Sequence, residues 1–87
     1  MYLHLGQSVV VPEAEIIGIF DLDNTTGSKI TREFLSDAEK EGSVVSVSEE
    51  LPRSFVVCSG QKMKIYLTQL SSQTLLKRSE TVQYNLT

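Results

Sequence analysis

The apolar run from Ile16 to Phe20 constrains the fold of this chain more than any other feature. Four of its five residues are large and apolar, and three of these are isoleucines. β-branched and aromatic residues favour strands. Because successive side chains of a strand point to opposite faces, an uninterrupted apolar run is typical of a strand that is covered on both faces. We therefore expect residues 16–20 to form a central strand that stops at Asp21.

The length of the chain limits it to one hydrophobic core. A chain of 87 residues falls in the size range of a single domain and buries roughly 60 to 65% of the surface that its unfolded form exposes. Hydrophobic residues make up 40% and charged residues 22% of the chain, which argues against a disordered or fibrous class. We expect one domain over residues 1–78 and a frayed tail over residues 79–87.

The other predicted strands are short. They cover residues 2–5, 8–11, 44–47, 54–59 and 63–67. Gly6-Gln7 and Gly60-Gln61 separate the members of two pairs, so each pair is expected to form a hairpin. In the second hairpin, alternation places Lys64 and Tyr66 opposite the apolar side chains of the same strand.

Two helices complete the predicted fold. Ser28 is suited to cap the first, and Gly42 to end it. Its apolar stripe consists of Ile30, Phe34, Leu35 and Ala38. Ser71 or Ser72 is expected to cap a short final helix that ends at Arg78. The order β-β-β-α-β-β-β-α indicates an α+β fold with a small, mainly antiparallel sheet of about six short strands, one main helix and one short C-terminal helix.

Charge is distributed unevenly along the chain. Residues 1–50 contain ten acids and three cations, a balance of −7, whereas residues 51–78 contain five cations and no acid. These cations are Arg53, Lys62, Lys64, Lys77 and Arg78. Such asymmetry indicates either a basic face for an anionic partner or complementary faces for self-association. Interleaving of both charges on a solvated surface is the alternative.

A short motif after the central strand resembles a catalytic one. The strand followed by Asp21-Leu22-Asp23-Asn24-Thr25 is similar to the first motif of the haloacid dehalogenase phosphatases. That resemblance implies Asp21 as nucleophile, Asp23 as acid and base, and a magnesium ion nearby. However, the chain offers no second acidic pair at a strand end, and the same residues are suited to leaving a strand and entering a helix. Asp21 and Asp23 therefore remain weak metal candidates, and a phosphatase remains a remote alternative.

Other catalytic sets and cofactor sites are not indicated. Cys58 and His4 are the only residues of their types, so a cysteine metal cage is excluded. A buried thiol and a hydrogen-bonded strand histidine are the expected roles. We therefore expect no enzyme activity and no cofactor. We also expect no membrane segment, because no apolar run approaches the roughly 18 residues that a membrane helix needs. Because residues 1–4 lack the features of a signal peptide, we expect a cytoplasmic protein.

A second resemblance covers nearly all of residues 1–78. It is carried by the segments 1–6, 9–11, 16–21, 33–35, 53–57 and 70–78, together with Tyr66. In content and order these segments resemble the RemA/RemB family of bacterial extracellular-matrix regulators, most closely its RemB branch. The resemblance implies a regulator of biofilm-matrix genes that forms homo-oligomers, and in the RemA branch the oligomer binds DNA through many weak contacts.

The sequence departs from the RemA branch where that branch has arginines. Glu15 occupies one such position and Leu51-Pro52 two others. The candidate nucleic-acid-binding residues are therefore the five cations of residues 51–78. Two main hypotheses remain: an oligomeric regulator that binds DNA, and an adaptor that binds another regulatory protein without binding nucleic acid.

Overall fold

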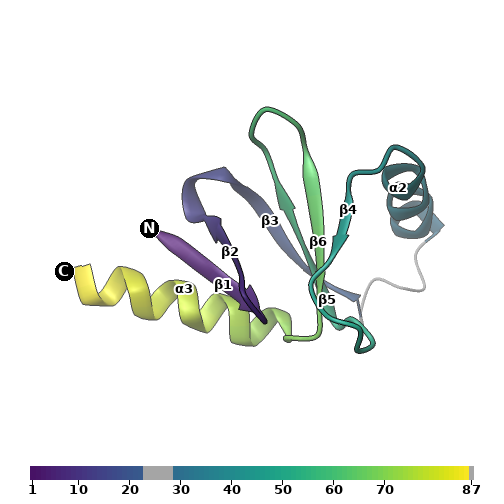
Figure 1. Cartoon of the computed structure of the whole chain (residues 1–87). Helices are drawn as coiled ribbons and strands as arrows, with labels where there is room; N and C mark the ends of the chain where they lie inside the picture. Colours follow the sequence, from purple (N-terminus) through teal and green to yellow (C-terminus); the bar gives the residue numbers. More distant parts are fainter. Residues whose placement is uncertain (23–28, 87) are drawn as a thin grey trace.

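The computed structural model describes residues 1–22 and 29–86 of the chain. Within these residues, six strands and two α-helices follow one another in the predicted order (Figure 1). The strands are β1 (Tyr2–Gly6), β2 (Val9–Pro12), β3 (Ile16–Asp21), β4 (Val44–Ser46), β5 (Ser54–Cys58) and β6 (Lys64–Thr68). The helices are α2 (Lys29–Lys40) and α3 (Ser72–Leu86), and a short 3₁₀ helix, η1 (Glu13–Glu15), joins β2 to β3. The α+β class is confirmed.

The strands form two sheets, where the sequence predicts one. β1 and β2 pair as an antiparallel hairpin, and the other four strands form a sheet in the order β3-β5-β6-β4. Only β4 and β6 run parallel, so the sheets are mainly antiparallel, as expected. The split arises because β1 and β2 pack on a face of the larger sheet instead of extending its edge, which lets a small chain cover its core with strands.

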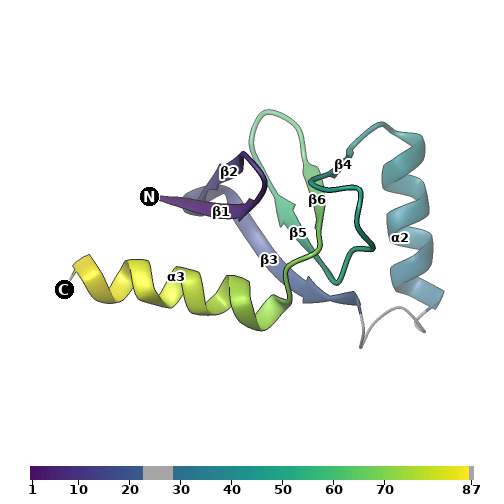
Figure 2. The same ribbon diagram turned by 60° about the horizontal axis from the view of Figure 1, so that its bottom comes forward.

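The larger sheet separates two groups of buried side chains. One face packs against the β1–β2 hairpin and α3, and its buried residues are Leu3, Leu5, Val11, Val47, Val56, Cys58 and Leu75. The other face packs against α2, and its buried residues are Leu22, Ala38, Phe55, Val57 and Ile65. Figures 1 and 2 show α3 with the hairpin on one side of the sheet and α2 on the other.

The prediction that residues 16–20 form a central strand is wrong. β3 lies at the edge of the larger sheet and pairs only with β5. Ile19 packs into the first core, but Ile17 is 63% exposed and Phe20 is 42% exposed. The hairpin and α3 cover one face of the strand, whereas α2 packs near β4 on the other face and leaves these two side chains partly exposed. An apolar run therefore marks an edge strand here.

The end of α2 confirms the role of Gly42. This residue has φ 75°, its N–H donates to the Glu39 carbonyl at 3.0 Å, and the Ser43 N–H donates to the Ala38 carbonyl at 2.9 Å. These two bonds are the pair that closes a helix at a glycine in the left-handed conformation. The predicted cap, Ser28, lies outside the described residues.

The final helix differs from its prediction in length. α3 begins after Ser71, whose hydroxyl accepts a hydrogen bond from the Thr74 N–H at 3.1 Å, so the predicted cap is confirmed. The helix continues through Leu86, however, and does not end at Arg78. Two side-chain contacts hold its middle to the start of the chain: Arg78 donates to the His4 carbonyl at 3.1 Å, and the Ser79 hydroxyl donates to the Glu13 carboxylate at 2.6 Å.

The structure also describes Cys58, His4 and the β5–β6 turn. Cys58 is 4% exposed, and the ring of His4 is hydrogen-bonded through Nε2 to the Gln7 carbonyl at 2.7 Å. The β5–β6 turn spans residues 59–63 and is longer than the predicted Gly60-Gln61 turn. Among the described residues, no helix has the length and apolar character required to cross a membrane.

Candidate functional site

The predicted basic residues occupy three separate places. Lys62 and Lys64 are exposed at the turn between β5 and β6. Arg53 precedes β5 and lies at the opposite end of that strand, where its N–H donates to the Thr68 carbonyl at 2.9 Å. Five strand residues, about 16 Å of extended chain, separate these ends. Within one subunit, Arg53 therefore does not join the turn lysines in one patch.

The cations of α3 form the third place. Lys77 and Arg78 are exposed on a helix that packs beside β1. The Arg78 guanidinium already donates to the His4 carbonyl, and Lys77 also makes an interaction within the chain. Figure 1 shows α3 at the side of the molecule away from the β5–β6 turn. At least part of this basic pair therefore has a structural role.

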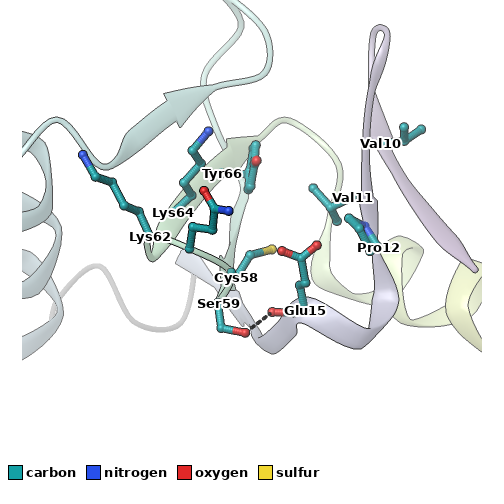
Figure 3. A pocket seen from close by; sticks show the side chains of 11 residues that line it. Val10, Val11, Pro12, Glu15, Cys58, Ser59, Lys62, Lys64 and Tyr66 are labelled. Atoms are coloured by element: carbon teal, nitrogen blue, oxygen red, sulfur yellow. Dashed lines mark hydrogen bonds between the residues drawn. The ribbon is translucent and has the colours of Figure 1, made fainter.

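A pocket of about 540 Å³ opens beside the turn lysines (Figure 3). We call it the hairpin pocket, since the first hairpin and the β5–β6 hairpin form its walls. It is lined by Val10, Val11, Pro12, Glu15, Cys58, Ser59, Gly60, Gln61, Lys62, Lys64 and Tyr66. Its volume is within the range of small-molecule sites. The pocket exists because the hairpin does not reach the turn end of the larger sheet.

Glu15 is held in place at the floor of the hairpin pocket. Its carbonyl accepts hydrogen bonds from the Ser59 N–H at 2.7 Å and from the Ser59 hydroxyl at 3.3 Å. Its carboxylate lies against Gly60, with Oε1 2.6 Å from the point where a Cβ of that residue would stand. In Figure 3 the carboxylate points into the pocket beside the Cys58 sulfur. η1 and the end of β5 therefore fix the backbone of Glu15 beside the pocket, and its carboxylate reaches the pocket floor.

Two neutral groups surround that carboxylate. Burial, and secondarily the charge of Glu15, raises the pKa of the Cys58 thiol above its usual value. Burial also raises the pKa of the Tyr66 hydroxyl, with smaller contributions from Cys58 and Glu15. Both groups remain protonated at neutral pH, so each can donate a hydrogen bond. Among the residues that the structure describes, Glu15 is then the only anionic side chain that lines the hairpin pocket.

The opposite face of the same sheet carries an apolar groove of about 410 Å³. It is lined by Ile17, Phe20, Thr31, Phe34, Phe55, Val57 and Met63. The Phe20 ring stacks on Phe55 with centroids 5.0 Å apart, and Phe34 contacts Phe55 at 6.5 Å from the other side. We call this surface the apolar groove. It borders β3, whose outer edge has no strand partner among the described residues.

The phosphatase-like motif receives little support from the described residues. Asp21 is the last residue of β3, and the Ser72 hydroxyl donates to its Oδ2 at 3.4 Å. Asp23 lies outside the described residues. No group of three or more histidine, cysteine, aspartate or glutamate side chains suited to a metal ion occurs in residues 1–22 and 29–86. Asp21 therefore has a structural contact that connects β3 to the start of α3.

The sequence alone predicts neither the hairpin pocket nor the apolar groove. Glu15 stands out in the sequence as a departure from a basic pattern, but nothing there places it opposite residues 58–66. Because Ile17 and Met63 have apolar neighbours in the sequence, we expect the side chains of both residues to be buried. Four exposed, large apolar side chains within one short strand, helix and turn are the usual sign of a contact surface, but exposure is visible only in three dimensions.

Comparison with known proteins agrees with the sequence resemblance. Residues 2–78 match the RemA-like family, described as extracellular matrix regulatory protein A-like. The chain is also 40% identical over 80 residues to the extracellular matrix regulatory protein B of Bacillus subtilis (strain 168), an alignment that covers 92% of this chain and 91% of that protein. The match spans both sheets, both hollows and the start of α3. The chain therefore belongs to the RemA-like family of extracellular matrix regulatory proteins.

Proposed function

We propose that this chain is a cytoplasmic regulator of bacterial extracellular-matrix genes that acts as a homo-oligomer, without catalysis, and contacts DNA through Lys62 and Lys64. The observation that carries the proposal is the apolar groove beside the free edge of β3. Ile17, Phe20, Phe34 and Met63 are between 37% and 63% exposed there. A patch of this kind on a small domain is expected to be covered by a partner subunit.

Oligomers would overcome the small number of cations in one subunit. Two turn lysines release too few counterions to hold DNA tightly, but a closed oligomer repeats the pair around its circumference. The lysines and the apolar groove occupy neighbouring parts of the chain, since Met63 lies between the lysines. Assembly through the groove would therefore place turns of adjacent subunits near one interface. The name of the Bacillus relative, an extracellular matrix regulatory protein, agrees with a role in regulation.

Assembly is tested with Ile17→Glu. We expect the unchanged protein to have a mass in solution that is a multiple of 9.7 kDa, measured by light scattering. Burying an unpaired carboxylate is costly, so Ile17→Glu should shift the mass toward that of one chain. Leu76→Glu is the control, because Leu76 is 49% exposed on α3 outside the groove. A folded Ile17→Glu variant with the original mass would contradict the assembly proposal.

DNA binding is tested with the double change Lys62→Glu and Lys64→Glu. It should weaken binding to all DNA sequences alike and reduce the dependence of the dissociation constant on salt. The matched control is Lys29→Glu with Lys40→Glu, which changes the net charge equally on exposed positions of α2. Equal loss of binding in both double variants would mean that only net charge matters, and the turn would not be the DNA contact.

A second candidate function is a protein-binding adaptor without a nucleic-acid role. The observation in its favour is that the five cations lie in three places on a chain of net charge −3. In that case the apolar groove would receive another regulatory protein. Folded, oligomeric protein that fails to bind DNA at low salt would favour the adaptor over the DNA-binding regulator.

A further inference from the structure

The hairpin pocket has a feature that neither assembly nor DNA binding requires. Among the described residues, no hydrogen bond or ion pair reaches the carboxylate of Glu15, although this side chain is half-buried. A carboxylate that lines a pocket and has no partner there can accept charge-assisted hydrogen bonds from a cationic group. An ammonium group in the pocket would supply that partner.

The position of Glu15 is built and not incidental. Two hydrogen bonds from Ser59 fix its backbone, and its carboxylate lies beside Gly60, with Oε1 2.6 Å from the position that a Cβ would take, so a side chain at residue 60 would displace it. Gly60 also has φ 145°, a conformation that L side chains rarely adopt. The turn therefore keeps the side of the pocket next to Glu15 open.

The other walls of the hairpin pocket suit an organic ammonium group better than a bare metal ion. Only one carboxylate lines the pocket, whereas hard cations take six or more oxygen ligands. The Tyr66 ring lies beside that carboxylate in Figure 3, and an aromatic ring attracts an ammonium group. Val10, Val11 and Pro12 supply an apolar wall along which a short alkyl chain can lie.

Positive charge lies on the far side of the hairpin pocket. Lys62 and Lys64 line it opposite Glu15, and in Figure 3 their amino groups extend away from that carboxylate. Lysine side chains have flexible four-carbon stems, so they can turn toward an anionic group at the mouth. The pocket thus has a negative floor, an apolar wall and a positive rim.

We propose that the hairpin pocket binds a small organic zwitterion, with its ammonium group at Glu15 and its anionic group at Lys64. The alkyl spacer lies on the wall formed by Val10, Val11 and Pro12. This site is distinct from the apolar groove, which is on the opposite face of the sheet. The inference rests on the pocket alone and stands whether or not the chain assembles or binds DNA.

The test uses three probes that share a five-carbon chain: 5-aminovalerate, pentylamine and valerate. Dissociation constants are measured by calorimetry, and amide NMR shifts of Glu15, Gly60 and Tyr66 locate the site. We expect 5-aminovalerate to bind at least about tenfold more tightly than either singly charged probe, because it makes two charge-assisted contacts where each of the others makes one.

Two variants separate the two ends of the ligand. Glu15→Gln should weaken the binding of 5-aminovalerate and pentylamine by about tenfold. The binding of valerate should stay unchanged or become tighter. Lys64→Gln should weaken 5-aminovalerate and valerate but not pentylamine. Glu13→Gln is the control, since Glu13 belongs to the same 3₁₀ helix but does not line the pocket.

The proposal fails if no probe shifts the pocket amides, if the three probes bind equally, or if Glu15→Gln and Glu13→Gln have equal effects. Far-UV circular dichroism of each variant verifies its fold. If Glu15→Gln is unfolded, Glu15→Asp replaces it: a carboxylate that is one methylene shorter should weaken pentylamine more than valerate. Equal changes for these two probes would overturn the assignment of Glu15.

Discussion

Gly60 shows how one residue can fix the shape of a pocket. Its φ of 145° favours glycine, and the Glu15 carboxylate occupies the space that a side chain would need. Gly42 has a positive φ of 75° as well, but no atom lies within 4 Å of the point where a Cβ would stand. Backbone conformation alone acts at Gly42, whereas at Gly60 a side chain would also displace the flexible end of the Glu15 side chain.

The comparison of the two glycines gives the first prediction. Gly60→Ala should lower the free energy of unfolding by about 1 to 3 kcal/mol, because a φ of 145° is strained for any residue with a side chain. Gly42→Ala should cost about 1 kcal/mol, since only the left-handed conformation is penalised. Urea denaturation followed by circular dichroism measures both. An equal loss of stability in the two variants would show that the backbone at residue 60 is no more strained than that at residue 42.

Cys58 provides a second prediction, on pH. Its pKa is raised above the ordinary value of 9.0 by burial first and by Glu15 second. Because the folded pKa exceeds the unfolded one, the contribution of the buried thiol to stability is complete below about pH 9 and is lost as pH rises through the folded pKa. The thiol should react slowly with iodoacetamide at pH 8, and Glu15→Gln should lower the pKa and speed the reaction. A free cysteine in denaturant is the reference.

At the scale of elements, one hydroxyl group joins the two sheets. Thr68 ends β6, is 1% exposed, and donates from Oγ1 to the Leu5 carbonyl of β1 at 2.6 Å. The same oxygen accepts a hydrogen bond from the Leu70 N–H at 3.1 Å. Since β1 and β2 share no strand pairing with the larger sheet, this bond is a direct polar link between them.

Replacing that hydroxyl is the third prediction. Thr68→Val keeps the shape but leaves the Leu5 carbonyl and the Leu70 N–H without this partner in the interior, so it should lower the free energy of unfolding by about 1 to 3 kcal/mol. The control is Ser72→Ala, which removes a longer bond of 3.4 Å to Asp21 and should change stability by about 0.5 kcal/mol or less. Thermal unfolding of both variants provides the measurement, and a neutral Thr68→Val would show that the link adds no stability.

At the scale of the whole molecule, the two proposed kinds of contact respond differently to salt. Assembly through the apolar groove buries apolar surface, which salt does not weaken. Head-to-tail pairing of the acidic first half with the basic second half would be screened, since the Debye length falls from about 10 Å at 0.1 M to about 3 Å at 1 M ionic strength.

The fourth prediction follows from this difference. The solution mass should be the same at 0.1 M and 1 M sodium chloride, as measured by sedimentation velocity at constant protein concentration. Dissociation at high salt would instead assign assembly to the charge asymmetry of the chain. Ile17→Glu, measured at both salt concentrations, shows whether any remaining oligomer depends on the groove.

Local patterns predict the elements of this fold better than their arrangement. Ser71 and Gly42 mark helix ends because capping depends on a few neighbouring residues. The run at residues 16–20 correctly predicts a strand, but its position in the sheet depends on where the hairpin and α2 pack, many residues away. The same long-range packing places Glu15 opposite residues 58–66. Neither the hairpin pocket nor the apolar groove could therefore be predicted from local sequence.

The contacts of β1 also determine when the fold can be completed. Its buried residues Leu3 and Leu5 share a core with Leu75, and its backbone is bound by Thr68 and Arg78 across separations of 63 and 74 residues. β1 therefore cannot complete its contacts until α3 has been synthesised. We expect slow folding limited by closure of this long loop, in keeping with the slow folding of proteins that have non-local contacts.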